Sequence, residues 1–273
     1  SPGWIKYIEH YYPELLPHIS SCKSPQQMFG AVAKTYYAQA GGVAPEDMFV
    51  VSIMPCTAKK FEANRPEMCD SGYQDVDAVL TTRELGRMLK QGGVDFNNLP
   101  DGQFDDPLGK STGAAAIFGA TGGVMEAALR TVYEVVTGET LQKLEFEDVR
   151  GMEGVKKSTV DLGGTKVNVA VAHGLAHAKK ICESIKNGEA DYTFIEVMCC
   201  PGGCIGGGGQ SYGTTNEIRQ KRINALYEVD ANMPIRKSHE NPAITQIYAE
   251  FLKEPLGEKS HHLLHTKYTN RGI

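Results

Sequence analysis

Phe49-Val-Val-Ser-Ile-Met-Pro-Cys56 and Thr193-Phe-Ile-Glu-Val-Met-Cys-Cys200 are two similar stretches of this sequence. Each is a largely apolar run that ends in Met, followed by one spacer residue and then Cys. Runs of this kind are typical of buried parallel strands, and ligands of open α/β sheets bind beyond the carboxyl ends of such strands. The likeness favours two strand ends that face one another, with two unrelated core strands as the alternative. The residues brought together would be Met54, Cys56, Met198 and Cys200.

Helical and strand patterns alternate around these two stretches. Strands are predicted at 76–80, 166–173 and 192–198, and helices at 82–91 and 175–187. This alternation indicates an α/β fold of two lobes, each a mostly parallel sheet flanked by helices, with a metal site in the cleft between them. We expect a first lobe at 1–110, a second lobe at 111–225 and a C-terminal helical wrap at 226–273.

Two helix starts carry capping signals. Ser24, Pro25 and Gln27 read as an N-cap, a proline at the first helical position and a capping box. Thr121 is expected to cap a long helix that closes at Gly138.

Composition excludes several classes of protein. The chain has 273 residues, 41% of them hydrophobic and 22% charged, with a net charge of −5. No run approaches the ~18 apolar residues of a membrane span. No basic stripe is present to neutralise the phosphates of a nucleic acid. Seven cysteines are too few for a disulfide scaffold, and an odd number cannot all pair. We expect a cytoplasmic protein, with a periplasmic location left open.

The chemistry concentrates after the second stretch, in Cys200-Pro-Gly-Gly-Cys204 and the glycines that follow. Two thiolates at this spacing can hold one face of an iron–sulfur cluster, and glycines at 202 and 203 let the backbone approach it closely. A zinc knuckle would need a second cysteine pair, and a phosphate loop would end in Gly-Lys-Ser/Thr. Cys56 could supply a third thiolate, and Lys59 an ammonium for a bound anion.

The full set of motifs resembles the iron-only (FeFe) hydrogenases. Met54-Pro-Cys-x-x-Lys-x-x-Glu62 and Glu196-Val-Met-x-Cys-Pro-Gly-Gly-Cys-x-x-Gly-Gly-Gly-Gln210 carry most of the likeness. Further matching segments extend it along the chain: Ser21-x-Lys-Ser-Pro-Gln-Gln27, Thr81-Thr-Arg-Glu-Leu85, Phe118-Gly-x-Thr-Gly-Gly-Val-Met-Glu-Ala127 and Ser238-His-Glu-Asn-Pro242.

The resemblance implies a cofactor and a set of roles. Cys56, Cys200 and Cys204 would ligate a 4Fe-4S cluster, and Cys204 would bridge it to a di-iron subcluster carrying CO, cyanide and a bridging dithiolate. Lys59 would bind a cyanide, Glu62 would help to orient Lys59, and Ser20 would belong to a proton path. The remaining implied residues pack or line the cofactor pocket: Met54, Met198, Phe118, Pro55, Ser24, Pro25, Gln26, Gly202 and Gly203.

By the same resemblance, the protein would interconvert H2 with protons and electrons. Electrons would be exchanged with ferredoxin or an NAD-linked redox partner subunit, and maturation proteins would insert the di-iron unit. No cysteine run for auxiliary ferredoxin-like clusters occurs in this sequence. The alternatives are a non-catalytic H2 sensor, an iron–sulfur assembly factor, or a structural zinc protein.

The chain departs from the family at two cysteine positions. Ser1-Pro2-Gly3-Trp4 aligns with the family motif Thr-Ser-Cys-Cys-Pro-x-Trp, so Ser1 falls where a fourth cluster cysteine is expected. Serine is a poorer cluster ligand, because its hydroxyl deprotonates far less readily than a thiol. The alignment leads us to expect roughly 90 further residues before Ser1 in a domain of ordinary size. Cys199, where alanine is usual, is expected to be a small buried residue rather than a functional thiol.

Overall fold

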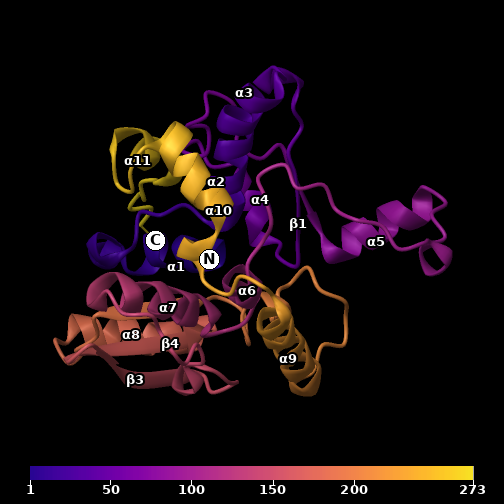
Figure 1. The fold of residues 1–273 in the computed structure, drawn as a ribbon. Coiled ribbons are helices and arrows are strands. Elements are labelled where there is room, and N and C mark those ends of the chain that lie inside the picture. The colour runs from indigo at the N-terminus through magenta and orange to yellow at the C-terminus, as the bar shows by residue number, and fades with distance from the viewer. Residues whose placement is uncertain (273) are drawn as a thin grey trace.

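The computed structural model describes residues 1–272 and shows an α/β architecture with two separate sheets (Figure 1). The first sheet pairs β1 (Val51–Met54) with β2 (Ala78–Thr81), and the second has the order β3 (Val155–Leu162), β4 (Thr165–His173), β5 (Phe194–Met198). The α-helices are α1 Pro2–Tyr11, α2 Pro25–Val32, α3 Ala38–Gly41, α4 Ala58–Ala63, α5 Thr82–Gln91, α6 Gly113–Ala116, α7 Gly123–Thr137, α8 Leu175–Lys186, α9 Asn216–Asn232, α10 Pro242–Ile247 and α11 Glu258–Leu264.

The first sheet is parallel and short. Met54 pairs with Thr81 at its carboxyl end, which sets the Cys56 segment beside the start of α5. The apolar run before Cys56 is not buried as predicted, because Phe49, Val51 and Ile53 are 71%, 45% and 50% exposed. Within residues 1–272, β1 has one neighbouring strand, β2, and one face of the pair lacks a covering layer.

The second sheet is mixed. A turn at Gly163-Gly164 joins the antiparallel hairpin β3–β4, and β5 adds parallel to β4. Helix α7 covers one face, where Met125 and Leu129 pack on valines of β3 and β4. Helix α8 covers the other face through Ile181, against the alanines of β4, and α1 packs outside α8. Because β4 is sandwiched between helices, its carboxyl end and that of β5 are held rigidly.

Two helix starts differ from the sequence prediction. Ser24 is the N-cap residue of α2 but makes no side-chain cap bond, and its hydroxyl donates to Glu62. At α7 the N-cap is Gly122, with φ +88°, not Thr121. The free N–H groups of that helix are taken by a carboxylate from another element, Glu196 of β5. At α7 a tertiary partner therefore replaces the local cap, and at α2 the predicted cap residue bonds to another element.

The C-terminal segment contacts both halves of the molecule. Ile247, Leu252 and Leu263 pack with Val32 of α2. Helix α9 is tied to α7 by the fully buried Arg130, whose guanidinium donates to Glu126 and Asp230 of α9. In Figure 1 the yellow helices α10 and α11 lie against the indigo α2.

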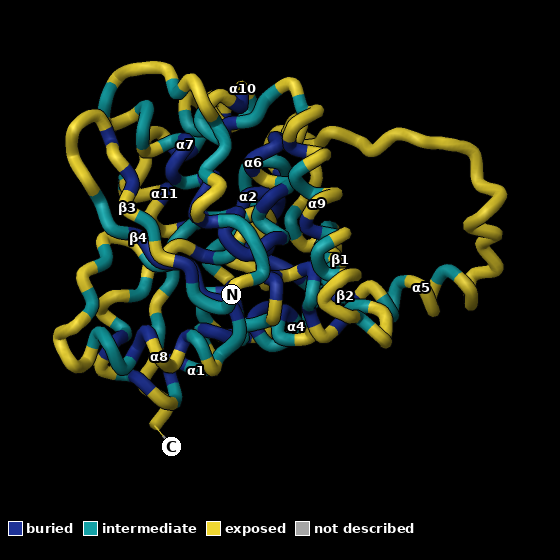
Figure 2. Tube along the Cα trace, turned by 90° about the horizontal axis from the view of Figure 1, so that it is seen from below, coloured by how far each residue is buried: buried dark blue, intermediate teal, exposed yellow. Residues whose placement is uncertain are grey.

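Residues 82–111 leave the body of the molecule as a long arm. Helix α5 has no buried residue, and the following loop exposes Phe96, Leu99 and Phe104. Figure 2 shows the loop as an almost entirely exposed, wide excursion. Across residues 1–272, no helix has the length and apolar character needed to cross a membrane.

Candidate metal centre

The two cysteine-bearing segments meet directly. Cys56 follows β1 and Cys200 follows β5, so each lies beyond the carboxyl end of a parallel strand, as the sequence predicted. The N–H of Gly209 donates to the carbonyl of Pro55 at 3.1 Å. A Cβ on Gly207 would stand 1.9 Å from the same carbonyl oxygen. The glycine run is therefore needed at this point, because only a bare backbone can approach the Pro55 peptide so closely.

The Cys200–Cys204 turn is held from its inner side by a histidine. The N–H of Gly202 donates to Nδ1 of His173 at 3.1 Å, and His173 Nε2 pairs with the carbonyl of Met152 at 3.2 Å. Burial lowers the pKa of His173, so the imidazole is neutral, with Nδ1 as acceptor and Nε2 as donor. The carbonyl of Gly202 in turn accepts from the N–H of Thr121 at 3.0 Å.

Gly203 and the buried carboxylate of Glu196 complete the support of this turn. A Cβ on Gly203, at φ +96°, would stand 2.7 Å from the nitrogen of Thr121. Glu196 accepts from the N–H groups of Gly122 and Met125 at 2.6 and 2.7 Å. Burial raises the pKa of Glu196, and these two N–H donors oppose that effect. The strand that carries Cys200 is thus fixed to the N-terminus of α7.

Lys59 is a buried cation on the other side of the site. Its Nζ lies 2.7 Å from Oε2 of Glu62, and the hydroxyl of Ser24 donates to the same oxygen at 2.8 Å. Gln26 donates from Nε2 to the carbonyl of Lys59 at 3.4 Å, and its Oε1 accepts from Ser52. Three predicted site residues therefore form one hydrogen-bonded group around the start of α4.

The thiols show the electrostatics of a metal-ligand set. Burial raises the pKa of the Cys204 thiol. The thiols of Cys199 and Cys200 share a hydrogen bond; this lowers the pKa of Cys199 to about 7 and, together with burial, raises the pKa of Cys200. Ligation by Cys200 and Cys204 would therefore release protons at neutral pH.

Ser1 lies at the same site. Its nitrogen is close enough to Lys59, Cys204 and Cys56 for their charges to act on it. Its hydroxyl accepts from the N–H of Cys199 at 3.2 Å. The position expected for a fourth cluster ligand is thus next to the other three, and it carries a serine.

Cys199 is half-buried and packs toward α1 rather than standing alone. Its Sγ would be 2.6 Å from a Cβ on Gly3, so glycine at that position makes room for the sulfur. The expected small buried residue matches this packing, while the shared hydrogen bond with Cys200 was not foreseen.

The remaining predicted residues are distributed around this centre. Met198 is buried at the end of β5, whereas Met54 and Phe118 are half-buried in separate apolar clusters. Pro25 is exposed at the start of α2. Ser20 is exposed, and its hydroxyl accepts from the N–H of Cys22. No described hydrogen bond links Ser20 to Cys56, Cys200 or Cys204.

The donor set fits an iron–sulfur group. The thiols of Cys56 and Cys200 are close enough to Cys204 for their charges to act on it, and a backbone hydrogen bond joins their two segments. At Gly203, Gly207 and Gly209 the neighbouring backbone is so close that only glycine fits. Thiolates are the ligands that iron–sulfur clusters require.

Sequence reasoning missed His173, and it quoted Glu196 only as part of a motif. Their roles depend on partners far away in the chain, so no local pattern could show them.

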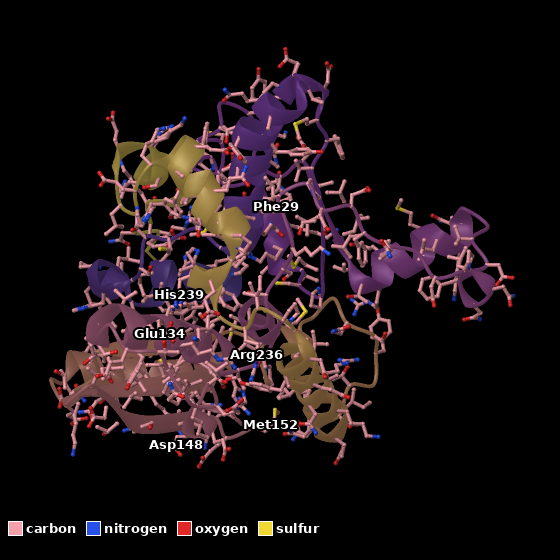
Figure 3. All side chains as sticks on the ribbon, viewed as in Figure 1. Phe29, Glu134, Asp148, Met152, Arg236 and His239 are labelled. Carbon is pink, nitrogen blue, oxygen red and sulfur yellow. The ribbon has the colours of Figure 1, made fainter. Side chains whose placement is uncertain are left out.

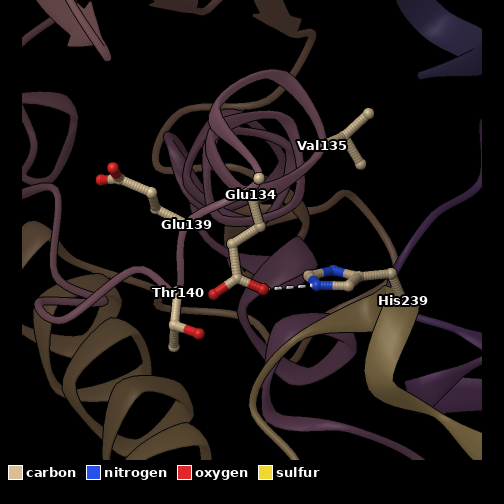
Figure 4. Close-up of a pocket in the computed structure, with 6 residues that line it drawn as sticks. Glu134, Val135, Glu139, Thr140 and His239 are labelled. Carbon is tan, nitrogen blue, oxygen red and sulfur yellow. Dashed lines mark hydrogen bonds and ion pairs between the residues drawn. The ribbon is translucent and has the colours of Figure 1, made fainter.

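A second polar cluster lies elsewhere. Glu134, His239 and Glu240 place one ligand atom each within 4.8 Å of one another, beside a cavity of about 260 Å³ (Figures 3 and 4). Lys237 already lies 2.7 Å from Glu134 and 2.9 Å from Glu240, and His239 pairs with Glu134 at 2.7 Å. This cluster is an ion-pair network that joins α7 to the C-terminal segment.

Three cysteines gathered beyond two strand ends, beside a buried lysine, are the arrangement expected of a cysteine-ligated metalloprotein. The profile of the iron only hydrogenase large subunit, C-terminal domain, matches residues 1–208, and that of the iron hydrogenase small subunit matches residues 216–271. The chain belongs to the iron-only hydrogenase family, as the sequence motifs predicted.

Individual relatives agree with this assignment. The NADP-reducing hydrogenase subunit HndD of Solidesulfovibrio fructosivorans is 56% identical over 99% of this chain and 46% of its own length. The structure of the [FeFe]-hydrogenase HydA1 from Chlamydomonas reinhardtii superposes with a TM-score of 0.85 and 44% identity, over 100% of this chain and 75% of that one. Protein NAR1 of Arabidopsis thaliana is 34% identical over 98% of this chain and 60% of its own length. The chain thus spans about half the length of the curated relatives it matches.

Proposed function

We propose that this protein catalyses the reversible reaction H2 ⇌ 2 H⁺ + 2 e⁻. The observation that carries the proposal is the group formed by Lys59, Glu62 and Ser24 beside the cysteines. A site that only held a cubane cluster would need thiolates and glycines, and a buried ammonium would add a desolvation cost without a benefit. A site that must also hold an anionic ligand gains from that ammonium.

In this proposal, Cys56, Cys200 and Cys204 would hold a 4Fe-4S cluster, and the site would also take a di-iron subcluster carrying CO, cyanide and a dithiolate, with Cys204 as the shared ligand. When bound, that group supplies the redox chemistry that makes or breaks the H–H bond. Lys59 donates to a cyanide ligand while Glu62 and Ser24 keep its ammonium in place. Met54, Met198 and Phe118 are proposed to exclude water, and Pro55, Pro25, Gln26, Gly202 and Gly203 to line the pocket.

Electrons are proposed to pass to ferredoxin or to an NAD-linked partner subunit, and maturation proteins to insert the di-iron group. The identity of 56% with an NADP-reducing hydrogenase subunit supports an NAD(P)-linked partner. The proposed compartment is the cytoplasm. Ser20 stays a proposed proton-path residue, since its hydroxyl faces the surface and could exchange protons with solvent.

The test is infrared spectroscopy of the full-length protein after co-expression with the hydrogenase maturation proteins. We expect CO and cyanide stretching bands, together with H2 evolution from a chemically reduced viologen. The Lys59→Met variant should lose both, while Lys60→Met, which removes a surface lysine one position along, should keep both. A protein that carries its 4Fe-4S cluster and shows no such bands after maturation would refute the proposal.

A second candidate is an iron–sulfur assembly factor, favoured by the 32% identity with the cytosolic iron-sulfur assembly component 3 of Rattus norvegicus over 98% of this chain. This role needs clusters but no di-iron group, so Lys59→Met would leave it intact. A non-catalytic H2 sensor would show the infrared bands with little turnover. The infrared and turnover measurements therefore separate the three functions.

A further inference from the structure

Arg219, in the first turn of α9, lies against the Cys200–Cys204 turn. Its Cδ would be 3.4 Å from a Cβ on Gly202, and its Nε 3.1 Å from a Cβ on Gly206. Gly202 and Gly206 are both within two residues of a cysteine proposed as a cluster ligand. The guanidinium therefore approaches the backbone of the turn where side chains are absent.

The hydrogen bonding of Arg219 is incomplete. One terminal nitrogen donates to Asn216 at 2.6 Å, but Nε is buried and has no acceptor among residues 1–272. A buried N–H without a partner costs about 1–3 kcal/mol, so a native protein usually provides an acceptor. The neighbouring Arg222 differs, since its guanidinium donates to the carbonyl of Ile205 at 2.9 Å.

The charge of Arg219 is also uncompensated. Across residues 1–272 no carboxylate forms an ion pair with it, whereas Glu62 neutralises Lys59 on the other side of the site. The Arg219 side chain lies against the backbone of the turn on both sides of Cys204, at Gly202 and at Gly206. A cation near a cluster stabilises its more negative, reduced form, because reduction adds an electron to an anionic group.

We propose that the positive charge of Arg219 raises the reduction potential of the iron–sulfur cluster held by Cys200 and Cys204. Its buried Nε–H would donate a hydrogen bond to a sulfur of that site. The inference rests on the proposed function only in requiring a cluster at these cysteines. It does not require the di-iron group or any turnover of H2.

The test uses the full-length protein reconstituted with iron and sulfide alone, without maturation proteins. A dithionite titration with redox mediators, followed by electron paramagnetic resonance of the reduced cluster, gives the ratio of reduced to oxidised cluster at a fixed potential. Arg219→Gln should lower that ratio at least threefold, which is about 28 mV at 59 mV per tenfold for a one-electron couple. Arg219→Lys, which keeps the charge but lacks Nε–H, should lower it by less.

Lys221→Gln is the matched control. Lys221 is exposed on the same helix and belongs to no described hydrogen bond or ion pair, so its removal changes the net charge equally without contacting the turn. In Lys221→Gln the ratio of reduced to oxidised cluster should stay within about 1.5-fold of that in the unsubstituted protein. Water and salt screen an exposed charge over a Debye length of about 8–10 Å.

Three outcomes would overturn the proposal. The first is an Arg219→Gln ratio as close to the unsubstituted value as that of Lys221→Gln. The second is loss of the cluster in both Arg219→Gln and Arg219→Lys, with circular dichroism unchanged, which would make Arg219 a purely structural residue. The third is an unsubstituted protein with no cluster signal, whereas a normal cluster signal without infrared bands after maturation would refute only the proposed function.

Discussion

Replacement of Lys59 by methionine tests whether the buried ion pair is the element that organises this site. The change leaves Glu62 with 7% of its side chain exposed and only the Ser24 hydroxyl as a partner. An uncompensated buried charge of this kind costs about 3–5 kcal/mol of unfolding free energy. For a chain of this size, 1 kcal/mol corresponds to about 2–4 °C, so the melting temperature should fall by about 6–20 °C.

The assay is guanidinium unfolding of the cluster-free protein, followed by far-ultraviolet circular dichroism. The surface pair Lys60–Glu84, with side chains 42% and 31% exposed, supplies the control, and Lys60→Met should cost at most about 1 kcal/mol. The double variant Lys59→Met/Glu62→Leu removes both charges and should be more stable than Lys59→Met alone. Equal losses for Lys59→Met and Lys60→Met, or strictly additive effects in the double variant, would refute the reasoning.

Three further predictions concern the glycines after Cys204, the support of the turn by His173, and the buried Lys156 of β3. Gly207→Ala places a Cβ 1.9 Å from the Pro55 carbonyl and should abolish iron binding on reconstitution, whereas Gly208→Ala, whose Cβ would meet nothing nearer than 3.5 Å, should bind normally; equal iron contents would contradict this. His173→Leu leaves the Gly202 N–H unpaired and should cost about 1–3 kcal/mol, with His173→Gln recovering part of it in the same unfolding assay. Burial lowers the pKa of Lys156 from 10.5 to about 8, so between these pH values the unfolded chain binds more protons than the folded one. The free energy of unfolding should therefore rise with pH from about 8 to about 10.5. Lys156→Met should lose this rise, and the same pH profile in the variant would contradict the prediction.

The strand ends and the cysteine motifs were predictable because they depend on local chemistry. A run of apolar residues that ends in Met-x-Cys places the thiol just past the end of a strand, whatever that strand packs against. Glycines that follow the cysteines indicate a place where two backbone segments come close together. The hairpin turn at Gly163-Gly164 follows from the same local rules. The burial of the first stretch was wrong because burial depends on what covers a strand, and one face of β1 lacks a covering layer in residues 1–272.

The helix caps show the limit of local reasoning. Ser24 has the residue type and spacing of an N-cap, yet its hydroxyl donates to Glu62 and makes no side-chain cap bond to the helix. The N-terminus of α7 is satisfied by Glu196, 74 positions along the chain from Gly122. Neither choice is visible in a window of a few residues.

The sequence alone determined the family and the α/β class and singled out the three cysteines proposed as thiol donors, because motifs and periodicities reside in neighbouring residues. Tertiary structure alone decided which groups act on those donors: His173 and Arg219 on the turn, Glu62 on Lys59, Glu196 on α7. Hydrogen bonds and charge interactions act over a few ångströms. Packing brings residues far apart in the chain within that range, so no sequence interval could reveal them.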